Sequence, residues 1–310
     1  MKIVTLTLNP AFDLHCHIPT FAPYHENIAE ITAMDAGGKG VNISKALTKN
    51  GVENLAVVVV GKENGTEFCR ALEKDGLNVA AIETTGRIRE NITLHEDKAD
   101  ETRISFHGFS CDKNILDEVQ KRIGATDGNT VVTFTGSIPK GITAQDVAAM
   151  LRTVRQTGAK IVIDSRSFSL ADLVEFKPWL IKPNKDEAEA YTGKTIGSPE
   201  DAGRIAKTLA AQGVENVVVS LGGDGAVLAT GERVWYAKTP KIKVASTIGA
   251  GDSLIAGFLD GKNAGYDAEN TLKKAVAYGS AACKQSGTRP PLPEDIAAIE
   301  REVEIVPLNV

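Results

Sequence analysis

The stretch Asn54-Leu-Ala-Val-Val-Val-Val-Gly61 carries six apolar residues in a row, without alternation between polar and apolar positions. A short run of this kind, rich in β-branched side chains, is typical of a strand that is buried on both faces. Such strands occur in parallel sheets that are covered by helices on both sides. The stretch therefore predicts an α/β fold.

The flanking segments continue an alternation of strands and helices. Strands are expected at Lys2–Asn9, Asn78–Thr84, Lys160–Ser165, Trp179–Asn184, Glu215–Ser220, Ala226–Thr230 and Arg233–Ala237. Helices are expected at Gly40–Gly51, at Thr66–Gly76, after a capping box formed by Thr143 and Asp146, from about Gly251, and over Ala268–Lys284, the last two completing the core. This order predicts a three-layer, doubly wound, mostly parallel sheet with an antiparallel edge where the last three strands follow closely.

Two regions, at about 11–35 and 87–109, interrupt the alternation. The first is irregular and has no helical period, whereas the second contains two short antiparallel strands, Asn91–Glu96 and Thr102–Gly108, around a charged turn at Asp97–Glu101. We expect the two regions to pack together as a small β-sheet outside the main body. The chain is thus predicted to be one domain, residues 1–310, with a discontinuous β lid.

Composition narrows the possible partners and the cellular compartment. The formal net charge of −5 argues against a nucleic-acid partner held by a general basic field. The four cysteines are scattered without a C-x-x-C pair, which predicts neither a zinc site nor a disulfide framework and favours a reducing compartment. There is no apolar run long enough for a signal peptide or a membrane span. A cytoplasmic protein with no membrane partner is therefore expected.

The segment Ser246-Thr-Ile-Gly-Ala-Gly-Asp252 is the strongest candidate for chemistry, because it leads directly into an apolar helix. Its two glycines allow backbone N–H groups to converge, and the helix start adds unpaired donors and a positive dipole end. A carboxylate at this place repels a phosphate, so an acid is unexpected if the site only binds one. The position of Asp252 is explained if its task is to take a proton from the hydroxyl that attacks the phosphate. The competing interpretations are an ordinary acidic first turn and a dinucleotide fingerprint, whose third glycine is replaced by Leu254.

Three further segments have both functional and purely structural interpretations. Ala36-Gly-Gly-Lys-Gly-Val-Asn42 lacks the upstream glycine and the Ser or Thr of a Walker loop, but it could bind a polyhydroxylated ligand or form a simple turn before a helix. Lys182-Pro-Asn-Lys-Asp-Glu187 is explained by a capping box, and a functional role would place Glu187 near magnesium-bound phosphates. Ser220-Leu-Gly-Gly-Asp-Gly225 is explained by a hairpin turn.

In this order and spacing, the four segments resemble the ribokinase-like (PfkB) carbohydrate kinases over essentially the whole chain. Thr7-Leu-Asn-Pro-Ala-Phe-Asp13 and Thr135-Gly-Ser-Ile-Pro139 make it most similar to the branch with 1-phosphofructokinase and tagatose-6-phosphate kinase. The resemblance implies ATP-dependent phosphoryl transfer to a hydroxyl of a sugar phosphate, with Mg²⁺ and with a requirement for a monovalent cation such as K⁺ left open. It also implies a homodimer formed through the lid.

The resemblance assigns roles to residues of this chain. Asp252 becomes the general base, and the backbone of Gly249, Ala250 and Gly251 becomes the anion hole. The sugar is assigned to Asp13, Gly37, Gly38, Lys39, Asn42, Arg89, Asn91 and Arg103. The nucleotide is assigned to Lys182, Asn184, Glu187, Ser220, Gly222 and Gly225, with Glu187 also organising the metal.

One departure concerns the lid. The branch usually carries Arg-x-Asn-x-Lys where this chain has Arg89-Glu-Asn-Ile-Thr93, so a lysine is missing. Either Lys39, Arg89 and Arg103 bind the phosphate of the substrate, or the substrate is an unphosphorylated sugar or polyol. A non-catalytic sugar or nucleotide sensor is the rival from another class, and a nicotinamide-dependent dehydrogenase is a weaker one.

Overall fold

The computed structural model describes residues 1–98, 101–231 and 233–310, and its centre is a ten-stranded sheet. Its strands, in spatial order, are β14 (Glu304–Leu308), β13 (Arg233–Lys238), β12 (Ala226–Thr230), β11 (Asn216–Ser220), β10 (Leu180–Ile181), β9 (Lys160–Asp164), β8 (Thr130–Thr135), β1 (Lys2–Thr7), β4 (Leu55–Gly61) and β5 (Val79–Thr84). The pairs from β5 to β11 are parallel, and those from β11 to β14 are antiparallel. The predicted doubly wound sheet with an antiparallel edge is confirmed.

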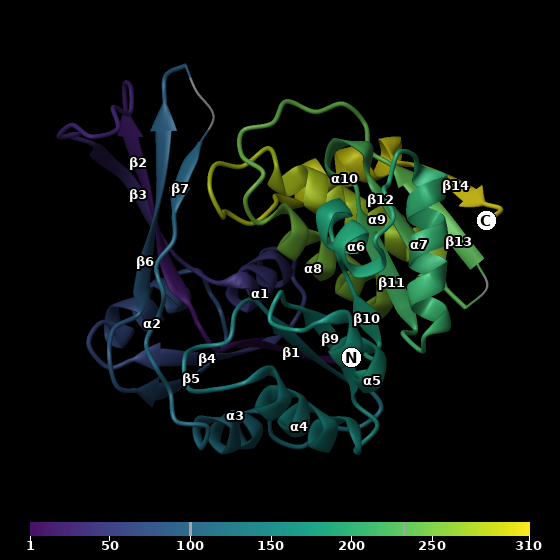
Figure 1. The fold of residues 1–310 in the computed structure, drawn as a ribbon, viewed down its shortest axis with the longest axis horizontal. Coiled ribbons are helices and arrows are strands. Elements are labelled where there is room, and N and C mark those ends of the chain that lie inside the picture. Colours follow the sequence, from purple (N-terminus) through teal and green to yellow (C-terminus); the bar gives the residue numbers. More distant parts are fainter. Residues whose placement is uncertain (99–100, 232) are drawn as a thin grey trace.

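Helices cover both faces of this sheet (Figure 1). One hydrophobic cluster joins the sheet to α1 (Lys39–Lys49), α8 (Ala250–Asn263), α9 (Ala268–Ala282) and α10 (Pro293–Glu302). The other cluster joins it to α2 (Gly65–Lys74), α3 (Ile115–Ile123), α4 (Ala144–Arg155), α5 (Leu170–Phe176), α6 (Lys185–Thr192) and α7 (Pro199–Ala211). Successive residues of β1, Ile3 and Val4, point into different clusters. Both strand faces are therefore buried, which explains the unbroken apolar runs.

A second sheet of four strands stands apart from the helical body (Figure 1). It consists of β3 (Glu30–Gly37), β2 (Ala11–Ile18), β6 (Arg89–Glu96) and β7 (Thr102–Ile104), in that order. The two predicted regions therefore do pack together, and we call this sheet the lid. Region 11–35 is more regular than expected, because β2 pairs with β3 on one side and with β6 on the other. Ala99 and Asp100, in the predicted charged turn, lie outside the described residues.

Three expectations about single elements were wrong. Strand β10 spans only Leu180–Ile181, because Pro183 has no N–H to donate and Asn184 already caps α6. Strand β7 ends at Ile104 rather than at Gly108. The core also continues past α9 with α10 and β14. Strand β14 was not predicted because its sequence, Glu-Ile-Val-Pro-Leu, contains Pro307, and a proline is tolerated in a strand only at a sheet edge.

Candidate active site

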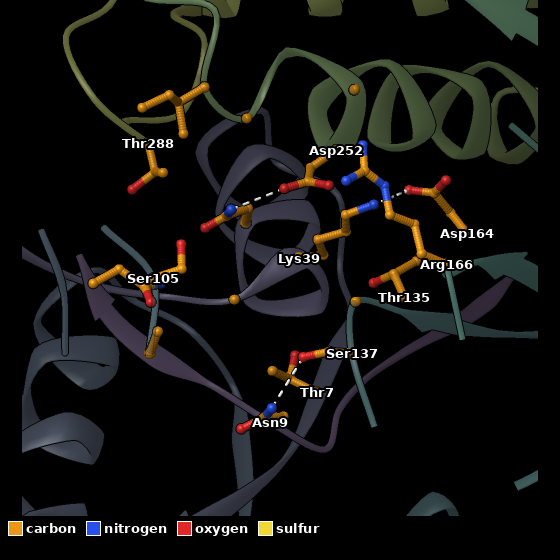
Figure 2. A pocket seen from close by; sticks show the side chains of 18 of the residues that line it. Thr7, Asn9, Lys39, Ser105, Thr135, Ser137, Asp164, Arg166, Asp252 and Thr288 are labelled. Atoms are coloured by element: carbon orange, nitrogen blue, oxygen red, sulfur yellow. Dashed lines mark hydrogen bonds and ion pairs between the residues drawn. The ribbon is translucent and has the colours of Figure 1, made fainter. Parts of the chain in front are cut away.

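A cavity of about 580 Å³ opens at the carboxyl ends of the central strands, between the main sheet and the lid. It is lined by residues that follow β1, β8, β9 and β10, by the first turns of α1 and α8, and by β2, β6 and β7 of the lid. Parallel sheets collect ligands at this edge, because loops from several strands converge there. Figure 2 shows that the charged and hydroxyl side chains from these elements face a common space.

Asp252 lies in the first turn of α8 with only 6% of its surface exposed. The helix begins after Gly249, whose φ of 80° is left-handed, so that the glycine turns the chain into the helix at this point. The Asn42 amide donates a hydrogen bond of 2.8 Å to Asp252 Oδ2. Burial raises the pKa of Asp252 to about 6, although the Lys39 charge and the Asn42 bond oppose the rise. The carboxyl is therefore a base near neutral pH.

The predicted anion hole occupies the start of α8. Gly249 and Gly251 line the cavity, and Ala250 lines a neighbouring cavity. The first N–H groups of a helix have no partner within the helix and carry its positive dipole end. Phosphate oxygens can be bound here next to Asp252.

A cluster of charges lies beside Asp252, and sequence reasoning named its two lysines but not Asp164. The Lys39 ammonium is 2.9 Å from Asp164 Oδ2, and the Lys182 ammonium is 3.8 Å from Asp164 Oδ1. Burial lowers the pKa of Lys39, but the negative charges of Asp164 and Asp252 outweigh that effect and leave the pKa raised. Lys39 therefore remains cationic next to the anion hole.

The opposite end of the cavity is formed by the lid. Asp13 is buried on β2, and its Oδ1 accepts hydrogen bonds of 3.0 Å from the Asn91 amide and from the Arg103 guanidinium. Arg89 donates to the carbonyl oxygens of residues 9, 10 and 106. Burial lowers the pKa of Arg89, Asp13 raises it, and the positive charge of Arg103 lowers it again. Two neighbouring guanidinium groups thus lie near one carboxylate, and Arg103 is hydrogen-bonded to it.

The glycines of the predicted sugar loop are required by close packing. A Cβ on Gly37 would lie 2.6 Å from Asp13 Oδ2, and a Cβ on Gly38 would lie 2.8 Å from Thr7 Cγ2. Gly38 also has a φ of 123°, which L side chains rarely adopt. Gly38, Lys39 and Asn42 line the cavity, whereas Gly37 lies just outside its lining. The loop therefore places backbone, amide and ammonium groups where a bulkier sequence would fill the space.

A second, more apolar cavity of about 510 Å³ adjoins the first. Gly222, Gly225, Ile242, Leu254 and Val276 are among its lining residues, and Ser220 and Gly251 line both cavities. The segment Ser220–Gly225 forms the tight turn between the antiparallel strands β11 and β12, as the hairpin interpretation predicted. A bound molecule with an apolar end in this cavity could reach the anion hole with its other end.

The capping-box interpretation of Asn184 and Glu187 is also confirmed. Asn184 Oδ1 accepts 2.8 Å from the Glu187 N–H, and Glu187 Oε2 accepts 3.1 Å from the Asn184 N–H. The other Glu187 oxygen accepts from Arg166 Nε at 2.9 Å. Both Asn184 and Glu187 nevertheless line the first cavity, so the structural role does not exclude a binding role.

Several lining residues were missed from the sequence. They are Thr7, Asn9, Ser105, Thr135, Ser137, Asp164, Arg166 and Thr288. Within the described residues, buried polar atoms without a partner include one oxygen from each of Thr7, Asn9, Asn42, Thr135 and Thr288, all of which line the cavity. An unpaired buried oxygen costs about 1–3 kcal/mol, which hydroxyl groups of a ligand or ordered water can recover. The detectable signal was the placement of these residues at or just after strand ends, except for Thr288, which lies between α9 and α10.

Comparison with known proteins agrees with this geometry. The model of the pfkB family carbohydrate kinases matches residues 15–295. The chain belongs to this family of carbohydrate kinases. It is 32% identical to a 1-phosphofructokinase of Haemophilus influenzae, with 92% of both chains covered, and 30% identical to that of Escherichia coli, with 99% of both covered. Phosphofructokinase-2 of E. coli, solved with substrates and products, superposes with a TM-score of 0.91 at 25% identity over 97% of this chain and 99% of that one.

The family assignment confirms the predicted fold and the predicted class of enzyme, a carbohydrate kinase that uses ATP. This outcome argues against the dehydrogenase and sensor rivals. Across the described ranges, no helix is long and apolar enough to span a bilayer. The roles of single residues at the site are addressed below.

Proposed function

We propose that this kinase transfers the terminal phosphate of ATP to a hydroxyl of a sugar phosphate. The observation that carries the proposal is the position of Asp252, a buried carboxyl with a pKa of about 6 at a helix start between two cavities. Asp252 takes the proton of the acceptor hydroxyl as that oxygen attacks phosphorus. The N–H groups of Gly249, Ala250 and Gly251, with Lys39 beside them, stabilise the charge on the transferring group.

The residues of the lid are the structural evidence for a phosphorylated acceptor. Thr93, which stands where the branch usually has lysine, pairs directly with Arg103 across β6 and β7. Cross-strand neighbours lie on the same face of a sheet, so the guanidinium of Arg103 provides a positive charge at the place of the missing lysine. Arg89 and Arg103 then form a doubly cationic end that suits a phosphate. The relatives named 1-phosphofructokinase fit this assignment.

The second cavity is proposed to take the base of the nucleotide, with Ser220, Gly222 and Gly225 along it and Lys182, Asn184 and Glu187 toward the phosphates. Mg²⁺ suits Glu187, because this ion needs only one or two carboxylates when phosphates and water complete its shell. No cluster of three or more His, Cys, Asp or Glu side chains is arranged for a metal within the described residues, which is consistent with such a shared shell. When bound, Mg²⁺ neutralises charge on the phosphates.

We further propose a homodimer formed through the lid and a cytoplasmic location. Ile31 and Met34 on β3 are 63% and 49% exposed, and Ile104 on β7 is 40% exposed, which is unusual for a fully solvated sheet. The four cysteines are unpaired, as is usual in a reducing compartment. A requirement for K⁺ is proposed on the basis of a similar structure, phosphofructokinase-2 of E. coli with potassium, at a TM-score of 0.90 and 25% identity.

The test is an ADP-release assay with ATP and Mg²⁺, with and without K⁺. The acceptors are fructose 1-phosphate, fructose 6-phosphate and tagatose 6-phosphate, each compared with its unphosphorylated sugar. Turnover on phosphorylated acceptors is expected. Turnover on neutral sugars alone would refute the assignment of the acceptor, and absence of turnover on every acceptor would refute the proposed activity on these sugars.

The phosphate subsite has its own test. Arg103→Ala removes one charge-assisted contact and should raise KM for the sugar phosphate about 10- to 100-fold. Arg87→Ala removes the same charge from an exposed residue just before β6, which pairs with Glu90 and does not line the cavity. Equal KM values for the two variants would contradict a phosphate contact at Arg103.

A further inference from the structure

Asp164 is a buried carboxylate at the end of β9, and neither the sequence motifs nor the proposed mechanism assigns it a task. Only 7% of its surface is exposed. It lies between two lysines from different elements, Lys39 in the first turn of α1 and Lys182 directly after β10. Figure 2 shows the Lys39 ammonium extended toward Asp164. A single carboxylate thus joins two cations from separate elements.

The two lysines lie next to different groups of the site. Lys39 is close enough to Asp252 for its charge to lower the pKa of that carboxyl. The Lys182 ammonium lies 3.1 Å from the point that a Cβ on Gly251 would occupy, so it stands directly beside the backbone of the anion hole. Neighbouring ammonium groups repel each other, and each lysine side chain carries about 2 kcal/mol of rotamer entropy. Without an anion between them, the two cations would not keep these positions.

We propose that Asp164 is a positioning residue that holds Lys39 and Lys182 next to the point of phosphoryl transfer. The inference rests on the proposed roles of Asp252 and the anion hole. Arranged in advance, the two cations stabilise the charge that develops in the transition state without reorganising at that moment. A displacement of about 1 Å in such groups can cost 100-fold in rate.

Asp164 also affects the base electrostatically. The charged groups that act on Asp252 are Lys39 from α1, Asp164 from β9 and Lys182 after β10. Asp164 is the only negative one among these three, and it raises the pKa of Asp252. Its removal should therefore make Asp252 lose its proton at lower pH, which a purely structural residue would not do.

Asp164→Asn is the main test, and Asp186→Asn is the matched control, because Asp186 is an exposed acid on α6 that does not line the cavity. In Asp164→Asn, kcat should fall about 10- to 100-fold, and KM for ATP should change much less. The acidic limb of the pH profile of kcat/KM should move to lower pH. Asp186→Asn should leave kcat and the acidic limb unchanged.

A readout without turnover separates this inference from the proposed function. Asp164 raises the pKa of Lys39, so its loss should increase the rate at which acetic anhydride acetylates Lys39, measured by mass spectrometry of the free protein. This experiment is informative even if the sugars tested give no turnover. An unchanged acetylation rate in folded Asp164→Asn would overturn the anchoring of Lys39.

Three further outcomes would count against the inference. If a lowered kcat returned to the wild-type value at high Mg²⁺, Asp164 would be a metal ligand instead. If kcat fell while the acidic limb stayed in place, the electrostatic role would be wrong. Should Asp164→Asn fail to fold, Asp164→Glu is the second variant, because it keeps the charge and moves it by one methylene group. This variant should lower kcat but leave the acidic limb near its wild-type position. A wild-type kcat in Asp164→Glu would count against positioning.

Discussion

Replacement of Asp252 by asparagine should remove most of the turnover and at the same time stabilise the protein near neutral pH. The change is nearly isosteric, and the local hydrogen bonds can be kept. Asn42 now donates 2.8 Å to Asp252 Oδ2, while the other Asn42 group, Oδ1, is buried without a partner. An asparagine at 252 can accept the same bond with its oxygen and offer its amide to Asn42 Oδ1.

The expected loss of kcat and the expected gain in stability both depend on the buried Asp252 carboxyl. A general base contributes about 10²- to 10⁴-fold to the rate, so kcat should fall by that factor. The pKa of Asp252 is raised from 3.8 to about 6, so the folded protein keeps a proton that the unfolded chain has lost between these values. Stability therefore falls as pH rises through this window. Above pH 6 the cost is complete, and at about 1.4 kcal/mol per pH unit it amounts to roughly 3 kcal/mol, which the asparagine variant avoids.

The assay combines kinetics with thermal unfolding. Turnover of both proteins is measured at pH 7.5 by coupled ADP release, and binding of a non-hydrolysable ATP analogue by calorimetry. Melting temperatures are compared at pH 4 and pH 7.5. The variant should bind the analogue as the wild type does, and it should melt on the order of 5 °C higher at pH 7.5 but not at pH 4.

Near-normal turnover in Asp252→Asn would refute the assignment of the base. Lost turnover with an unchanged melting temperature at both pH values would keep the base but contradict the raised pKa. Loss of both turnover and analogue binding would show that Asp252 acts in nucleotide binding.

The remaining predictions concern pH, the nucleotide cavity and assembly. In the wild type, kcat/KM should fall about tenfold per pH unit below pH 6 as Asp252 takes up one proton, and a flat profile from pH 5 to 8 would contradict this. Gly225→Ala would place a Cβ against Ala237 O at a φ of 96°, so it should lower the melting temperature and raise KM for ATP. Gly128→Ala, which has open space and lines neither cavity, should change neither. Ile31→Glu should convert a lid dimer to a monomer in size-exclusion chromatography with light scattering, and an unchanged mass would argue against pairing through β3.

Local patterns in the sequence were sufficient for most elements. The apolar run at 55–60 indicated a strand with two buried faces, and the capping boxes before α4 and α6 lie where Thr143 and Asn184 predicted them. Such signals succeed because they depend on residues only a few positions apart. They missed β14, where pairing with β13 rather than local preference decides that a short segment forms a strand, and they made β10 too long because the effect of Pro183 and of the Asn184 cap was not taken into account.

The same distinction between local and long-range features applies to the residues of the site. The sequence by itself determined the glycine loops and Asp252, because backbone geometry and the helix start are local properties. Only the tertiary structure joined Asn42 to Asp252 across 210 positions, set Arg103 opposite Thr93, and placed Asp164 between two lysines. Strand register and burial determine which distant residues come into contact. The same burial raises the pKa of Asp252 to about 6, where the carboxyl can act as a base near neutral pH.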